Sequence, residues 1–139
     1  MATVLFQWHE GVRYNPYRDS GGVLSFCYGH TGSDIVPGER YSAAECQALL
    51  DSDLKAAIAV VDANVTVPLT ENQKAALASF VYNVGSGAFE HSTLLKKLNA
   101  GDRVGACNEI RRWKYVDGKV SKGLVSRRAV EREFCLKSV

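Results

Sequence analysis

The chain has 139 residues, of which 46% are hydrophobic, a size and composition typical of one globular domain or of one domain divided into two small lobes. Its formal net charge of +2 is too small to predict a nucleic-acid-binding protein. No apolar run approaches the roughly 20 residues of a membrane helix, and the N-terminal MATVLFQWHEG lacks the features of a signal peptide. We therefore expect a protein made in the cytoplasm without stable membrane association.

The first predicted elements are a short helix over residues 2–10 and a β region over about 11–41. Glycines and prolines occur too often in the second segment for a helix. Asp19-Ser20-Gly21-Gly22 is typical of a turn, and residues 23–28 suit the strand that follows. This part of the chain is expected to form a hairpin or a small sheet.

Two capping boxes then predict helix starts. Ser42-Ala43-Ala44-Glu45 begins a helix over about 43–63, and Thr70-Glu71-Asn72-Gln73 begins a helix that continues to about Val84. The second helix is apolar nearly all round, which predicts the most buried helix of the domain.

Three further helices are expected over residues 92–99, 102–115 and 124–136, with a turn at Asp117-Gly118. Spacing in the second of these helices predicts four inward side chains: Val104, Cys107, Ile110 and Trp113. A small β region followed by a run of helices indicates an α+β fold with segregated strands.

The segment Glu10–Thr31 holds two acids, a hydroxyl and a histidine at defined spacings. Glu10 is followed after eight residues by Asp19, then after five by Ser25, and His30 lies in a Tyr-Gly-His-Thr sequence. This pattern resembles the catalytic signature of the phage-type lysozymes (endolysins of glycoside hydrolase family 24), in which Thr is commoner at the position of Ser25. The resemblance extends to four later segments: residues 80–85, 92–95, 111–113 and 123–128.

The resemblance implies a two-lobed lysozyme-like fold in a single domain, 1–139. The small N-terminal β lobe would cover about 11–41 and the connecting helix about 43–63. The mostly helical lobe would cover about 64–139, together with the N-terminal helix, and the cleft would lie between the lobes.

The activity implied by the resemblance is hydrolysis of the β-1,4 bond between N-acetylmuramic acid and N-acetylglucosamine in peptidoglycan, leading to lysis of a bacterial host. Glu10 would be the general acid, because a sheltered carboxyl has a raised pKa and can protonate the leaving oxygen. Asp19 in its turn would stay ionised and, with Ser25, hold the attacking water for an inverting reaction. No metal or other cofactor is implied.

Four more positions match the family. Asn83 corresponds to an amide lining the saccharide cleft, and Arg128 to an arginine paired with the catalytic glutamate, so both are candidates for substrate binding. Helix packing and a solvated surface charge are the alternatives for these two residues. His30 and Asp53 would form a structural pair, unless Asp53 is solvated at the edge of its helix.

The four cysteines, Cys27, Cys46, Cys107 and Cys135, include no CxxC pattern, so a zinc site is not expected. Free thiols and two disulfides remain equally open. If bridges form, we expect Cys27–Cys46 and Cys107–Cys135, each within one half of the chain. A catalytic Cys27–His30 pair finds no counterpart in the family.

Two other functions compete with the lysozyme interpretation. One is a non-catalytic peptidoglycan-binding module, against which the presence of both Glu10 and Asp19 argues. The other is a nucleic-acid-binding domain using Arg111-Arg112 and Arg127-Arg128, although nearby glutamates interrupt these pairs. We expect a monomer that binds peptidoglycan glycan strands, binds no nucleic acid and acts on the periplasmic cell wall.

Overall fold

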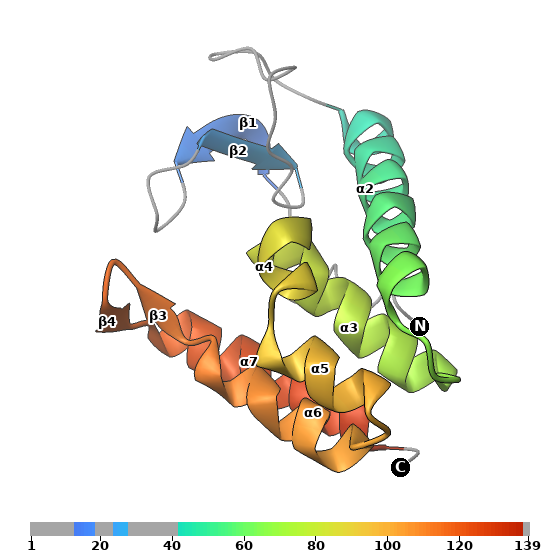
Figure 1. The fold of residues 1–139 in the computed structure, drawn as a ribbon. Coiled ribbons are helices and arrows are strands. Elements are labelled where there is room, and N and C mark those ends of the chain that lie inside the picture. Colours follow the sequence, from blue (N-terminus) through green and yellow to red (C-terminus); the bar gives the residue numbers. More distant parts are fainter. Residues whose placement is uncertain (1–12, 19–23, 28–41, 138–139) are drawn as a thin grey trace.

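The computed structural model describes residues 13–18, 24–27 and 42–137, with side chains from residue 42 onward. Within this part the chain forms a small two-stranded sheet, one long helix, a cluster of shorter helices and a second small hairpin (Figure 1). This arrangement confirms the predicted α+β class. The predicted N-terminal helix over residues 2–10 lies outside the described residues.

The first sheet pairs β1 (Arg13–Arg18) with β2 (Leu24–Cys27) in antiparallel register. Tyr17 lies opposite Ser25, and the register shifts between Arg13 and Tyr17. The predicted β region is confirmed for these strands, and β2 contacts the long helix that follows.

That helix, α2 (Ala43–Asn64), begins at the predicted capping box. The Ser42 hydroxyl accepts from the Glu45 N–H at 3.1 Å, and a Glu45 carboxylate oxygen accepts from the Ser42 N–H at 3.1 Å. Apolar residues at helical spacing place one side of α2 against the core: Cys46, Leu50, Leu54, Ala57 and Val61. In Figure 1, α2 runs from the β1–β2 sheet to the cluster of helices.

The centre of that cluster is α3 (Glu71–Val84), which also begins at its predicted capping box. Every residue from Ala75 to Val81 is buried, as the pattern predicted. The helix packs against α2 on one side and α7 on the other. Gly85 ends it with a φ of 93°, a conformation that favours glycine. The next short helix, α4 (Ser86–Glu90), was not predicted, because the glycines at 85 and 87 disfavour a helix.

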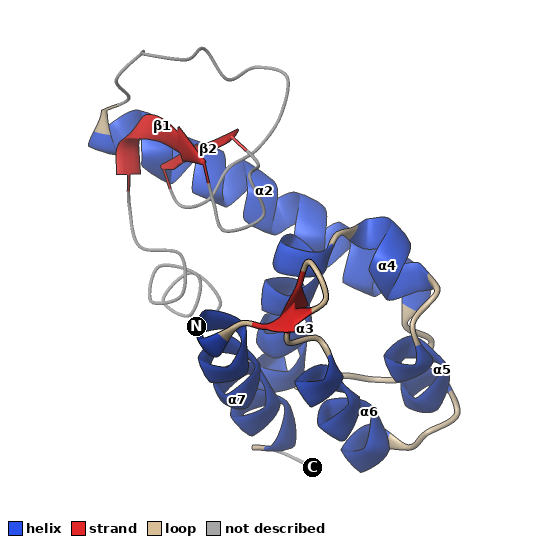
Figure 2. Cartoon of the chain, turned by 90° about the vertical axis from the view of Figure 1, so that its left-hand side faces the viewer, coloured by secondary structure: helices blue, strands red, loops and turns tan. Residues whose placement is uncertain are grey.

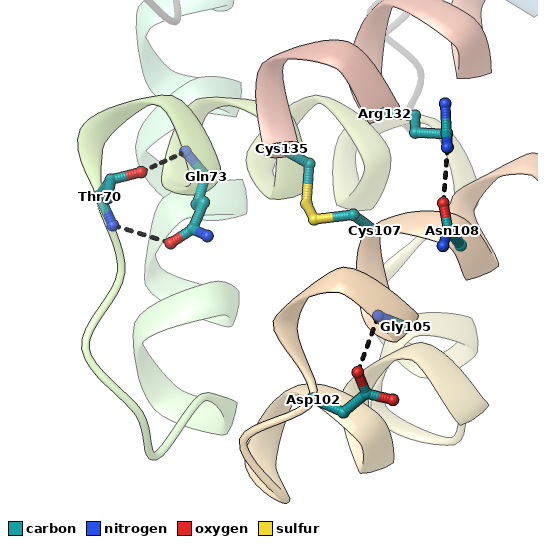
Figure 3. Close-up of a disulfide and its surroundings, with 8 residues drawn as sticks. All are labelled: Thr70, Gln73, Asp102, Gly105, Cys107, Asn108, Arg132 and Cys135. Carbon is teal, nitrogen blue, oxygen red and sulfur yellow. Dashed lines mark hydrogen bonds between the residues drawn. A yellow bond between two sulfur atoms is a disulfide. The ribbon is translucent and has the colours of Figure 1, made fainter. Parts of the chain in front are cut away.

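Side-chain caps start the helices that follow. Ser92 caps α5 (Thr93–Asn99), Asp102 caps α6 (Arg103–Glu109), and Ser121 caps α7 (Lys122–Leu136), which begins two residues earlier than predicted. Figure 3 shows the Asp102 carboxylate accepting the Gly105 N–H, at 2.9 Å. Figure 2 shows these helices grouped around α3.

The prediction of one helix over 102–115 was wrong in its second half. After α6 the chain makes one 3-10 turn, η1 (Ile110–Arg112), and then an antiparallel hairpin of β3 (Tyr115–Val116) and β4 (Lys119–Val120). The predicted Asp117-Gly118 turn is confirmed as the two-residue loop of this hairpin. Both residues have positive φ, 50° and 77°, which matches the right-handed twist of paired strands.

Early termination of α6 also changes which side chains face inward. Cys107 and Ile110 are buried, and Trp113 packs against the core as a half-buried side chain. Val104, predicted to face inward, is 49% exposed, so that prediction was wrong.

The disulfide Cys107–Cys135 joins α6 to α7, as expected if bridges form (Figure 3). Cys46 is also disulfide-bonded. The side chain of Cys27, its predicted partner, lies outside the described part. No helix among the described residues is both long and apolar enough to cross a bilayer.

Candidate active site and its supports

Of the predicted catalytic groups, only Ser25 falls on residues that the structure describes. Ser25 is on β2, where only the backbone is described, and it lies opposite Tyr17 of β1. Glu10, Asp19 and His30 lie outside the described residues, so their roles remain predictions. The structure does describe the three candidate residues that lie on helices: Asn83, Arg128 and Asp53.

Arg128 of α7 and Asn83 of α3 are brought together. The Arg128 side chain is 2% exposed. One terminal nitrogen, Nη2, donates to the Asn83 Oδ1, and Nε donates to the Trp113 carbonyl at 2.8 Å. The alternative of a solvated surface charge is therefore wrong for Arg128. Asn83, by contrast, is exposed, so this bond links the interior to the surface.

The Arg128 guanidinium belongs to a buried ion cluster centred on Glu131, which is 0% exposed. Arg128 Nη1 donates to one Glu131 oxygen at 2.6 Å, and Arg127 Nε donates to the other at 3.2 Å. The Ser79 hydroxyl of α3 donates to that second oxygen, while Arg127 Nη2 donates to the Ser79 carbonyl at 3.0 Å. We call Ser79, Arg127, Arg128 and Glu131 the α3–α7 ion cluster.

Burying these charges is costly, so the cluster is stable only because hydrogen bonds replace the lost water. Aromatic side chains add a further constraint. The Arg128 guanidinium lies over the Phe80 ring, 5.1 Å from its centroid. Phe80 in turn meets Trp113 edge to face, with ring centroids 5.4 Å apart. The orientation of Arg128 is thus fixed from several sides, and the Asn83 amide that it holds is fixed with it.

Asp53 of α2 is half-buried rather than fully solvated. It lines a hollow of about 260 Å³ with residues of α3 and α4, among them Val81, Tyr82 and Ser86. A carboxylate in such a place is consistent with the expected His30 partner. That pair remains a prediction, because His30 is not described.

A second acid, Glu109 at the end of α6, was not singled out by sequence reasoning. Lys97 Nζ lies 2.7 Å from one of its oxygens and Arg112 Nη1 lies 3.1 Å from the other. The hydrogen bond from Lys97 holds the pKa of Glu109 below its ordinary value; Arg112 acts in the same direction and partial burial opposes both. Glu109 lines a hollow of about 660 Å³ with His91 and Trp113, among others. A carboxyl with a lowered pKa is ionised at neutral pH, so it is unsuited to donate a proton.

Comparison with known proteins decides the family. A family model described as phage lysozyme matches residues 7–131. The chain belongs to the phage lysozyme family. The resemblance drawn from the Glu10–Thr31 segment is thereby confirmed, and that segment lies within the matched range. Family membership makes the chain a glycoside hydrolase of peptidoglycan, of the endolysin type.

Individual relatives agree with this assignment. The SAR-endolysin of Bacteriophage PS119 is 55% identical over 127 residues, covering 91% of this chain and 76% of the relative. The structure of an endolysin from Escherichia coli O157:H7 phage FAHEc1 matches with a TM-score of 0.87 and 32% identity, over 99% of this chain and 92% of that one. The muramidase domain of SpmX from Asticaccaulis excentricus also gives 0.87, at 33% identity, over 97% and 94%. The predicted lysozyme-like fold is confirmed.

Proposed function

We propose that this lysozyme cleaves the β-1,4 bond between N-acetylmuramic acid and N-acetylglucosamine, with Glu10 as the general acid. Asp19 stays ionised and, with Ser25, holds the water that attacks the opposite face of the sugar. His30 and Asp53 pair to tie the β lobe to α2. Membership of the phage lysozyme family and the Glu10–Ser25 spacing support these roles.

The observation that carries the proposal furthest is the link from the α3–α7 ion cluster to Asn83. Arginine can only donate hydrogen bonds, so the oxygen of the Asn83 amide must face Arg128. This leaves the amide N–H₂ group to donate to a sugar hydroxyl or acetamido oxygen. Asn83 is then a substrate-binding residue, and the buried Arg128 positions it instead of meeting the polysaccharide directly. The family resemblance implies that Arg128 also pairs with Glu10.

The Cys107–Cys135 disulfide supports a site of action outside the reducing cytoplasm. We propose that the protein acts as a monomer on the periplasmic cell wall and causes lysis of the host cell. Arg127 and Arg128, one of the two basic pairs that suggested a nucleic-acid partner, are buried, so that pair is not available to bind one.

The assigned acid is tested by clearing of a peptidoglycan suspension. Glu10→Gln keeps the size of the side chain but cannot donate a carboxyl proton, so we expect a loss of about 10²-fold or more. Glu133→Gln, at an exposed position on α7, is the matched control and should clear like the parent. Equal clearing by Glu10→Gln would contradict the assignment. No clearing by the parent would favour a binding module.

The positioning role of Arg128 is separable from binding by Asn83. Asn83→Ala removes a contact that is present in both the bound and the transition state, so it should raise KM by several-fold with little change in kcat. Arg128→Lys keeps a charge but loses the fork of donors, and it should lower kcat as well. Equal effects of both variants on KM alone would contradict a positioning role.

A further inference from the structure

The β3–β4 hairpin projects from the helical cluster on a fixed base. The Ser121 N–H donates to the Lys114 carbonyl at 2.8 Å, one step beyond the paired strands. The Ser121 hydroxyl also accepts the Leu124 N–H and so caps α7. Figure 1 shows β3 and β4 at the outer edge of the cluster of helices. The hairpin therefore presents its side chains at the surface in a defined arrangement.

This hairpin exposes an apolar pair. Tyr115 and Val120 lie directly opposite each other in the antiparallel register, so their side chains share one face, and each is 56% exposed. Val125, in the first turns of the adjoining α7, is 45% exposed. The fourth exposed large hydrophobic residue in the described part of the chain, Val104, lies on α6. Exposed apolar side chains are thus concentrated in this one segment, which is typical of a contact surface.

Lysines surround the apolar pair. Lys119 and Lys122 are exposed, and the Lys114 Nζ lies 5.8 Å from the ring centroid of the tyrosine that follows it. Residues 114–125 contain these three lysines and one acid, Asp117, so the segment carries a net charge of +2. A tyrosine beside lysines is typical of segments at a membrane interface, where the ring lies among the headgroups and the ammonium groups reach the phosphates.

The shape of the hairpin indicates what kind of partner fits it. The hollows lined by Asp53, by Glu109 and by Arg103 include none of residues 114–125. A small ligand is usually bound in a concave site that encloses it. A layer of lipid headgroups can instead deform around a projecting apolar pair, and its phosphates supply the negative charge that the lysines lack.

We propose that residues 114–125 bind the surface of a membrane that contains anionic phospholipid. The side chains of Tyr115 and Val120 enter the headgroup layer, and the lysines contact the phosphates. The association is weak and reversible, because two apolar side chains bury little area and each lysine strengthens binding only about fivefold. This inference goes beyond the proposed function and does not depend on it. Its effect is to keep the enzyme close to the part of the wall that lies next to the membrane.

Cosedimentation of the whole protein with lipid vesicles tests this inference. The parent should bind vesicles made of phosphatidylglycerol and phosphatidylcholine in equal parts, and should bind pure phosphatidylcholine vesicles at least roughly tenfold more weakly. Added salt should release it from the anionic vesicles. Lys119→Gln/Lys122→Gln should weaken the partition roughly tenfold or more, and Tyr115→Ser/Val120→Ser should weaken it by several-fold.

Matched controls make the same kinds of change elsewhere. Lys55→Gln/Lys96→Gln removes two exposed lysines from α2 and α5, and Val104→Ser removes the exposed valine of α6. Both controls should bind the vesicles like the parent. Equal weakening by the lysine control would overturn the inference, since it would show an effect of net charge alone. Unchanged binding by both hairpin variants would overturn it too.

A second measurement locates the contact within the chain. In phosphatidylglycerol bicelles that contain a nitroxide-labelled lipid, amide NMR signals of residues 114–125 should broaden more than those of α5. Broadening confined to other residues would contradict the inference. So would hairpin variants that bind vesicles like the parent but no longer cosediment with peptidoglycan, which would assign the surface to the wall. The proposed function fails separately, if the parent does not clear peptidoglycan.

Discussion

Two glutamates in the helical lobe each lie between two cations, and their surroundings differ. Glu131 is 0% exposed between Arg127 and Arg128, with a hydroxyl from α3 completing its contacts. Glu109 is also buried, at 9% exposure, but its partners Lys97 and Arg112 have side chains that are 40% and 71% exposed.

The difference shows what burial adds to the same set of charges. Water reaches the two cations that pair with Glu109 and screens these pairs, so each contributes less to stability than a fully buried pair. The groups around Glu131 are shielded from water, so they must form their hydrogen bonds with each other. Only the buried set can therefore hold Arg128, and through it Asn83, in one orientation.

The largest expected effect is that of Glu131→Gln. Two arginines would lose a buried counter-charge, so the free energy of unfolding should fall by about 3–5 kcal/mol. Urea unfolding at pH 7, followed by circular dichroism, measures this. A loss below about 1 kcal/mol, similar to that of an exposed pair, would contradict the contrast drawn between the two glutamates.

The Cys107–Cys135 disulfide connects the helices that carry these two acids and should rank second. A Cys107→Ala/Cys135→Ala variant should lose roughly 2–4 kcal/mol, chiefly because the unfolded chain is less constrained. Thermal unfolding of this variant measures the loss without reducing the bond made by Cys46. Since the cluster does not include either sulfur, kcat at 25 °C should stay near that of the parent. A large drop in kcat in the folded variant would show that the disulfide itself positions the site.

Glu109→Gln should have the smallest effect, about 1 kcal/mol at neutral pH. The pKa of Glu109 is lowered in the folded state, so its stabilisation is present above the ordinary carboxyl pKa and is lost as pH falls through the lowered value. The parent and the variant should therefore converge in stability below about pH 4. Urea unfolding at a series of pH values measures this difference. If the difference in stability between the parent and Glu109→Gln stayed constant down to acidic pH, the charge of Glu109 would not be its cause.

Local signals in the sequence were enough to predict most of the helices. The starts of α2 and α3 could be predicted from the capping boxes at Ser42 and Thr70, because these hydrogen bonds join residues only three positions apart. The apolar composition of α3 likewise predicted its burial. Asp117-Gly118 predicted a turn whose positive φ angles follow from the same residues.

Elements that depend on tertiary contacts were not predictable in this way. The strands β3 and β4 have two residues each, too few for an alternating pattern to be recognised, so the segment up to Tyr115 resembled a continued helix. Arg128 and Glu131 follow Leu124 by four and seven residues, so helical spacing places them on the side of α7 that also carries Cys135. Their charges nevertheless favour a solvated edge, because the groups that pair with them in the interior come from α3 and Trp113. For Arg128, the family resemblance also pointed to the position.

The most direct test of the proposed function is to identify which bond of peptidoglycan is cleaved and whether Glu10 is needed to cleave it. Peptidoglycan digested by the parent should gain reducing ends, and borohydride reduction followed by hydrolysis should identify the new ends as N-acetylmuramic acid. The Glu10→Gln protein should produce almost none. New free amino groups without new reducing ends, or muramic acid ends released equally by both proteins, would contradict the assigned bond or the assigned acid.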